Sequence, residues 1–166
     1  MRRLRIKKIV VVLTIAVLLL TAYLIYSRPL TISQLYPILT LDKCTEIRGY
    51  YEIGTQAEQT EFAIEQNSEE FQKLCSMFYE QKYRRSLRDI LLRGTRIHRT
   101  EPDDFQWDVY FYFEDIAFPD GSSGSGAMLH FLSWYGELDI YFDGETHSCY
   151  TSEQEVWTKE VLDIIQ

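Results

Sequence analysis

A run of basic residues in the middle of the chain is the strongest candidate for chemistry in this sequence. Between Lys82 and Arg99 lie seven of the eleven Lys and Arg residues that follow residue 28. Guanidinium groups bind carboxylates and phosphates through paired hydrogen bonds, so the segment is suited to hold an acidic protein or an anionic polymer of the cell envelope. The alternative is that these side chains pair with acids of their own domain or lie on a solvated face. The residues that we expect to contact a partner are Arg84, Arg85, Arg88 and Arg96.

A second candidate is the pair His147 and Cys149, which lie two residues apart on a predicted strand and so share a face. A Cys–His nucleophile needs such proximity together with a third group that orients the base, and Asp139 is the acid that we consider for this role. No local signature of a thiol enzyme accompanies the pair. We therefore expect no catalysis and no cofactor, and keep a cell-envelope hydrolase or thiol enzyme as an alternative.

Two groups of acids are candidates for a calcium site. The group that contains Asp139 lacks the alternating oxygen ligands of a calcium loop. The spacings between histidines and cysteines in the sequence are not typical of a zinc site. We expect these acids to be solvated and to bind no metal. The groups are Glu101, Asp103, Asp104 and Asp108, and Asp139, Asp143 and Glu145.

The three cysteines are candidates for a disulfide bond. Cys75 falls on the apolar stripe of a predicted helix, which favours a buried thiol. Cys44 and Cys149 lie near strand ends and are the only pair that we consider for a disulfide in an exported domain. We favour three free, buried thiols over that pairing.

A long apolar segment precedes all of these residues. Ile9–Tyr26 contains no charge and would span roughly 27 Å as a helix, close to the ~30 Å hydrocarbon core of a bilayer. Five basic residues and no acid lie in residues 1–8, which predicts a cytoplasmic N-terminus. The run is longer than the apolar region of a signal peptide and no small-residue cleavage pattern follows it, so we expect it to remain attached. The predicted divisions are a cytoplasmic segment (1–8), a transmembrane anchor (9–26), a juxtamembrane connector (27–41) and an extracytoplasmic domain (42–166).

The charge of the exported part limits its partners. Eleven basic residues stand against all 25 Asp and Glu after residue 28, which gives a formal charge of −14. Such a domain is repelled by the phosphate backbone of nucleic acids, so nucleic-acid binding is not expected.

Periodicity in the exported part predicts strands and helices in the order ββα(α)ββββα. Alternating apolar residues predict the strands, and polar caps before apolar stripes predict helices that begin near Ser68, near Ser86 and at a capping box over Ser152–Glu155. Short links favour an α+β fold, in which a mainly antiparallel sheet has helices on one face. A helical turn is predicted at Thr31–Tyr36 and a loop at Pro119–Gly126. The predicted strands are Cys44–Ile53, Thr60–Ile64, Asp108–Asp115, Ala127–Tyr135, Leu138–Phe142 and Glu145–Tyr150.

These features predict a membrane-anchored extracytoplasmic domain that binds or assists an unidentified partner at the cell membrane. Besides the enzyme alternative, a third hypothesis is a small membrane subunit or regulator that acts through its transmembrane helix. Thr14 and Thr21 lie seven residues apart on one face of that helix and carry the hydroxyls that would bond another helix.

Overall fold

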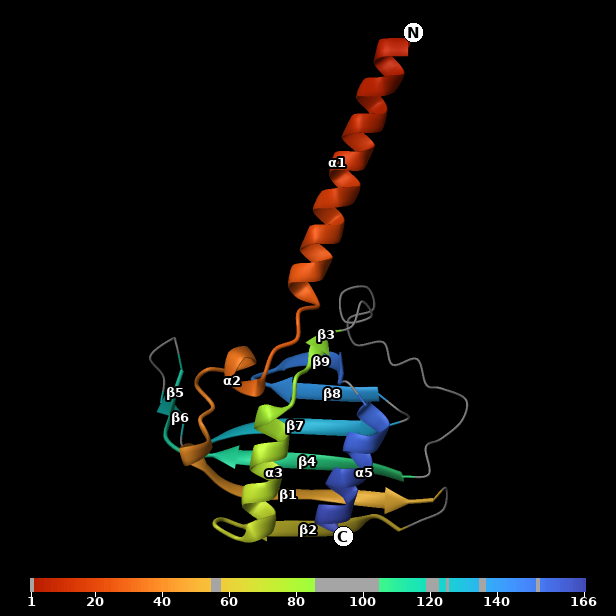
Figure 1. The fold of residues 1–166 in the computed structure, drawn as a ribbon. Coiled ribbons are helices and arrows are strands. Elements are labelled where there is room, and N and C mark those ends of the chain that lie inside the picture. The colour runs from red at the N-terminus through yellow and green to blue at the C-terminus, as the bar shows by residue number, and fades with distance from the viewer. Residues whose placement is uncertain are drawn as a thin grey trace.

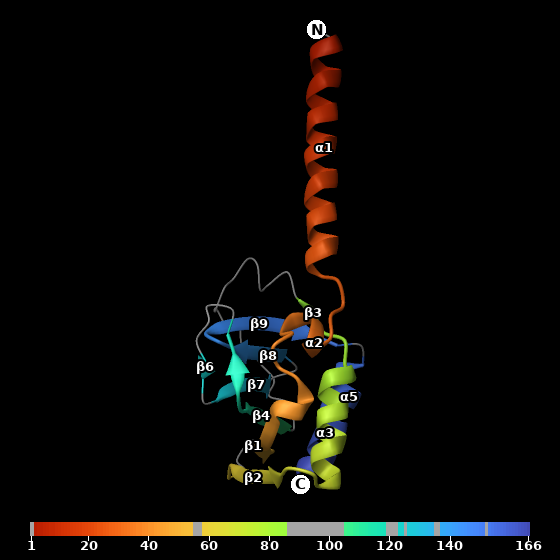
Figure 2. The ribbon, with the colours of Figure 1, turned by 90° about the vertical axis from the view of Figure 1, so that its left-hand side faces the viewer.

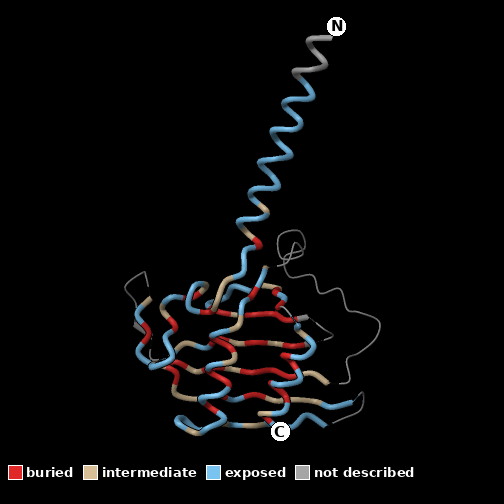
Figure 3. Tube along the Cα trace, in the orientation of Figure 1, coloured by how far each residue is buried: buried red, intermediate tan, exposed pale blue. Residues whose placement is uncertain are grey.

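A long apolar helix and a sheet domain are the two parts of the molecule. The computed structural model describes residues 2–54, 58–85, 105–118, 123–124, 126–134, 137–151 and 153–166. Helix α1 (Arg2–Tyr26) projects away from the sheet (Figure 1). Its segment Lys8–Tyr26 is long and apolar enough to cross a membrane and has no part buried inside the molecule. Figure 3 shows this exposure along nearly the whole helix, which is a candidate membrane span as the sequence predicts.

The domain is α+β, as predicted, and its described strands include one seven-stranded antiparallel sheet in the order β2-β1-β4-β7-β8-β9-β3. The bounds of β1 and β9 coincide with the predicted strands, and those of β2, β4, β7 and β8 differ by a few residues. The sheet strands are β1 (Cys44–Ile53), β2 (Thr60–Glu65), β3 (Arg84–Arg85), β4 (Phe105–Phe113), β7 (Ala127–Trp134), β8 (Glu137–Phe142) and β9 (Glu145–Tyr150).

Helices α3 (Glu69–Glu80) and α5 (Gln154–Ile165) cover one face of this sheet (Figure 2). The start of α3 agrees with the prediction, because Oγ of Ser68 accepts a hydrogen bond of 3.0 Å from the amide of Phe71. Ser152, the first residue of the predicted capping box of α5, lies outside the described residues. Glu153 is the residue before the helix, it has a left-handed backbone (φ 56°), and its side chain caps nothing.

Phe78 of α3 lies at the centre of the core between the helices and the sheet. Its ring centroid lies 4.6 Å from Phe131 and 5.0 Å from both Phe111 and Trp157. These edge-to-face contacts join α3, β4, β7 and α5, so the aromatic residues of the sheet mainly serve packing on this side. The opposite face of the sheet carries no described helix.

The connector after α1 is packed onto the domain. It forms the predicted short turn as α2 (Ile32–Leu35), where the amide of Thr31 donates to Oε1 of Gln34 at 3.1 Å. Ile32 and Leu39 are fully buried in the core. A 3₁₀ turn, η1 (Leu41–Lys43), leads into β1. The connector therefore holds the end of α1 close to the sheet.

The segment predicted as a loop, Pro119–Gly126, contains one strand of a short two-stranded sheet. β5 (Ile116–Ala117) pairs with β6 (Ser123–Gly124), so two residues of that segment are in a strand. β3 was also not predicted, because two residues are too few to show a period. The helix predicted over residues 86–94 lies outside the described residues.

Candidate functional site

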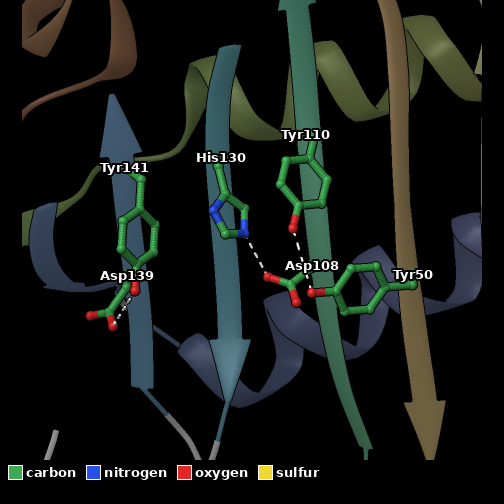
Figure 4. A network of polar contacts seen from close by, with 6 residues as sticks. All are labelled: Tyr50, Asp108, Tyr110, His130, Asp139 and Tyr141. Atoms are coloured by element: carbon green, nitrogen blue, oxygen red, sulfur yellow. Dashed lines mark hydrogen bonds and ion pairs between the residues drawn. The ribbon is translucent and has the colours of Figure 1, made fainter. Parts of the chain in front are cut away.

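A cluster of aromatic and polar side chains lies on the face of the sheet opposite α3 and α5, which we call the helix-free face. The register places the cluster in two adjacent rows across β1, β4, β7 and β8. Residues that oppose one another across strands share a face, so these side chains must lie together. The members of the cluster are Tyr50, Asp108, Tyr110, His130, Asp139 and Tyr141 (Figure 4).

The closest polar contact of the cluster joins His130 and Asp108. Nε2 of His130 lies 2.6 Å from Oδ1 of Asp108, and the two side chains are only 16% and 9% exposed. The two residues are diagonal neighbours on β7 and β4, since His130 opposes Tyr110 and Asp108 opposes Leu132. The carboxylate therefore fixes the plane of the imidazole ring from one side.

Two tyrosine rings hold the imidazole of His130 between them. The ring of Tyr110 is stacked on it at a centroid distance of 4.2 Å, and the ring of Tyr141 lies at 4.8 Å from the other side. The interplanar angles are 12° and 19°. His130 can therefore present only its ring edge, because both of its faces are covered.

Tyr50 extends the cluster toward the edge of the sheet. The hydroxyl of Tyr110 donates a hydrogen bond of 3.5 Å to the hydroxyl oxygen of Tyr50. Burial, followed by hydrogen bonds to Asp108 and Tyr110, raises the pKa of the Tyr50 phenol well above its ordinary value. Burial likewise raises the pKa of Tyr110. Both phenols therefore keep their protons at neutral pH and act as hydrogen-bonding groups.

Asp139 is the second buried carboxylate of the cluster. Its oxygens accept hydrogen bonds from the hydroxyls of Ser148 at 2.7 Å and Tyr141 at 3.3 Å. The expectation that the acids Asp108 and Asp139 are solvated is wrong, since they are only 6% and 8% exposed. They lie in the interior strands of a sheet, where neighbouring aromatic side chains cover them.

The described residues around the His130–Asp108 pair limit the chemistry that this arrangement displays. Within the described residues, no Ser, Thr or Cys is hydrogen-bonded to His130, so the His–Asp pair lacks the nucleophile of a hydrolytic triad. The described residues also contain no group of three His, Cys, Asp or Glu side chains arranged to hold a metal ion. What the cluster offers is a set of oriented carboxylate, phenol and imidazole groups.

The arginines predicted to contact a partner are only partly described. Arg84 and Arg85 form β3, at the sheet edge nearest to α1 (Figure 1), where they pair with Tyr150 and Cys149 of β9. Arg84 is exposed and Arg85 is half-buried. Arg88 and Arg96 lie outside the described residues.

His147 and Cys149 lie on one face of β9, as predicted, but that face is turned toward the core. Cys149 opposes the buried Leu138 and is itself buried, and Nε2 of His147 lies 3.6 Å from a carboxylate oxygen of Glu145. Asp139 opposes Ser148, so it lies on the other face of the sheet. The three residues considered for a thiol site are therefore not brought together.

No disulfide bond joins any of the three cysteines, and all three are buried. Cys44 and Cys149 cannot pair, because their strands are four steps apart in the sheet, about 19 Å at the usual strand spacing. Cys44 instead has Cys75 of α3 as its neighbour. The hydrogen bond between the two thiols, together with burial, raises the pKa of Cys44, while the same hydrogen bond lowers that of Cys75.

The sequence analysis did not predict this cluster, and it considered two of the members, Asp108 and Asp139, only as candidates for other sites. The alternation in β4 places Asp108 and Tyr110 on the face opposite Trp107 and Val109, as the register confirms. What it missed is His130, because only the pairing of β4 with β7 shows that this residue lies between Tyr110 and Tyr141. The signal available in the sequence was a polar residue on a strand with an apolar neighbour on each side, which describes His130.

Comparisons with models of protein families, with curated proteins and with solved structures found no match for this chain.

Proposed function

We propose that the protein is a single-pass membrane protein whose domain lies outside the cytoplasm and binds a partner through its helix-free face. The exposed apolar surface of Lys8–Tyr26 supports the anchor, since a helix of this kind is stable in lipid and the segment is not buried inside the molecule. The basic residues before it support a cytoplasmic N-terminus. The localisation is the cell membrane, and the role is binding without catalysis.

The observation that carries the binding role is the aromatic and carboxylate cluster itself. Burying two carboxylates in a sheet costs more free energy than burying apolar side chains of similar volume, even where hydrogen bonds compensate. A face that served only stability would be apolar or freely solvated. The oriented groups around His130 are better explained by recognition of another molecule.

The chemistry of this face favours a partner that carries positive charge and hydrogen-bond donors. The cluster contributes two carboxylates, and the whole chain beyond residue 28 carries a formal charge of −14. Phenol rings add surfaces on which a cationic group can rest. The partner is therefore a protein or peptide segment with exposed Lys or Arg.

Site-specific photo-crosslinking in cells tests this proposal. A photoreactive residue in place of Met128, which is 43% exposed on the helix-free face, should form a covalent adduct with the partner. The same residue in place of Val156, which is 54% exposed on α5, should not. Asp108→Asn should abolish the adduct at position 128 while the variant stays folded by circular dichroism. Equal adducts from positions 128 and 156, or adducts that survive Asp108→Asn, would contradict the assignment.

The two alternatives have less support from the geometry. The enzyme hypothesis requires His147, Cys149 and Asp139 to lie close together, but these residues lie on opposite faces of the sheet. A role for the membrane helix needs polar groups that reach another helix. The hydroxyls of Thr14 and Thr21 instead donate to the carbonyl oxygens of Val10 and Val17 in their own helix, each at 2.9 Å.

A further inference from the structure

The end of α1 and strand β3 are held together, although more than fifty residues separate them in sequence. Leu30 and Tyr83 exchange two backbone hydrogen bonds of 2.9 Å each, which extends the edge of the sheet into the connector. The guanidinium carbon of Arg85 lies 5.3 Å from the centre of the Tyr26 ring, a cation–π contact. Figures 1 and 2 both show β3 directly below the end of α1.

Four basic residues belong to the segments that meet at this junction, and we call them the basic collar. Arg28, Lys82 and Arg84 are exposed and Arg85 is half-buried. Neither segment 27–41 nor segment 81–85 contains an acid. In the part of the chain that the structure describes, none of the four forms an ion pair with Asp or Glu. Among the described residues, the collar is therefore a local excess of positive charge on a strongly acidic domain.

Arg85 has an unused hydrogen-bond donor. Its Nε is buried from solvent and has no hydrogen-bond partner among the described residues. A buried guanidinium N–H that donates to nothing is unfavourable, because it has lost its water without gaining an acceptor. Among the described residues this donor therefore lacks an acceptor, and an acceptor placed beside Tyr26 would complete it.

The position of Tyr26 indicates what that acceptor is. Tyr26 is the last residue of the apolar helix, and tyrosines at the end of a membrane span lie at the level of the lipid head groups. Arg85 contacts this ring, so it lies at the same level. Phosphate is the acceptor present there in every leaflet, and its oxygens match the planar fork of a guanidinium group.

We propose that the basic collar binds the phosphate groups of anionic lipids in the outer leaflet, with Arg84 and Arg85 as the main contacts. The inference rests on the proposed function, since it requires α1 to span the membrane. It replaces the acidic protein or anionic envelope polymer as the partner of these two arginines. The collar holds the β3 edge against the bilayer, while repulsion between the other acids and the lipid surface keeps the rest of the domain away from it.

Lipid retention in nanodiscs tests the proposal. The full-length chain is inserted into nanodiscs that contain equal amounts of phosphatidylglycerol and phosphatidylcholine, and native mass spectrometry counts the lipids that remain bound after release. The wild-type chain should retain phosphatidylglycerol at least about fivefold over phosphatidylcholine, the preference expected of one or two charge-assisted contacts. The double variant Arg84→Gln/Arg85→Gln should retain the two lipids equally.

The matched control is Arg48→Gln/Lys159→Gln, which removes two positive charges at exposed side chains that pair with Glu46 and Glu155. This variant should keep the wild-type preference. Excess inorganic phosphate should leave the retained phosphatidylglycerol unchanged, because the bound group is part of a lipid beside the anchor.

The possible outcomes separate this proposal from the proposed function. A wild-type chain that enters nanodiscs but shows no preference, or a collar variant that keeps the preference, overturns the lipid contact and leaves the anchor standing. Displacement by inorganic phosphate also overturns it, as does an equal loss of preference in the control variant. A chain that does not enter nanodiscs overturns both.

Discussion

At the scale of single residues, the most informative contact is the one between His130 and Asp108. Both side chains are largely buried on the helix-free face, and Nε2 of His130 lies 2.6 Å from Oδ1 of Asp108. The stacked rings of Tyr110 and Tyr141 hold the imidazole in the plane that this contact needs. The pair therefore contributes to stability and sets the geometry of the proposed binding face.

A double-mutant cycle measures how strongly the two residues interact. Asp108→Ala, His130→Ala and the double variant should show a coupling of about 1–3 kcal/mol in the free energy of unfolding, because each single change leaves the other group buried without its partner. Urea denaturation followed by circular dichroism gives the three values. Strictly additive effects would contradict the contact.

Cys149 provides a second test at this scale, directed at the enzyme alternative. Its thiol is buried against the core, so a thiol-reactive probe at neutral pH should label it far more slowly in the native domain than in urea. The Cys44→Ser/Cys75→Ser variant isolates this thiol for the measurement. Labelling of native Cys149 at the denatured rate or faster would revive the thiol-enzyme alternative.

At the scale of elements, the central strands show why alternation predicted some parts of the fold and not others. The ten residues of β1 alternate clearly, and their predicted and observed bounds agree. β3 has two residues, and its place beside β9 depends on the connector and on the Leu30–Tyr83 bridge, which no local pattern contains. The sequence could not exclude a Cys44–Cys149 disulfide for the same reason. The order of the strands, which no local pattern contains, sets the distance between the two cysteines.

Gly49 marks a close approach between elements that the sequence did not reveal. A Cβ atom built on Gly49 of β1 would collide with the backbone oxygen of Asp108 on β4 and with the ring of Phe62 on β2. The neighbouring backbone cannot yield without breaking the β1–β4 ladder. The absence of a side chain is therefore a packing requirement at this position.

We expect Gly49→Ala to lower the free energy of unfolding by about 1–3 kcal/mol, the usual cost of forcing extra volume into a packed site. The same change at Gly126 is the control, since among the described residues a Cβ there would meet only the carbonyl oxygen of Phe113, at an ordinary 3.6 Å. Thermal denaturation of both variants gives the comparison. Equal stability of Gly49→Ala and the wild type would show that the strands are farther apart than described.

At the scale of the whole molecule, the prevalence of tyrosine has a measurable consequence at high pH. Burial is the main cause that raises the pKa values of Tyr50, Tyr79, Tyr83 and Tyr110 above the ordinary 10.0. The folded state then binds protons more tightly than the unfolded state. This contribution to stability is fully present below pH 10.0 and is lost as the pH rises toward the folded-state pKa values.

A spectroscopic titration of tyrosinate absorbance checks this prediction. Only part of the 12 tyrosines should ionise near pH 10.0 while the domain stays folded, and the rest should ionise together with cooperative unfolding at higher pH. Circular dichroism recorded on the same samples reports the unfolding. Ionisation of every tyrosine near pH 10.0 with the fold intact would contradict the described burial.

The whole molecule also separates its charges in space. The basic collar lies at the end of α1, and the carboxylate cluster lies on the helix-free face, so the proposed lipid contact and the proposed binding of a cationic partner use different surfaces. This division requires the chain to span a membrane, with the domain outside the cytoplasm.

Protease accessibility tests that requirement most directly. Cells that express the full chain with a C-terminal epitope are converted to protoplasts, treated with added protease and then extracted with alkaline carbonate. We predict that the undigested chain stays in the membrane pellet and that added protease removes the epitope from intact protoplasts. A chain that carbonate releases into the soluble fraction, or an epitope that is digested only after lysis, would contradict a membrane-anchored domain outside the cytoplasm.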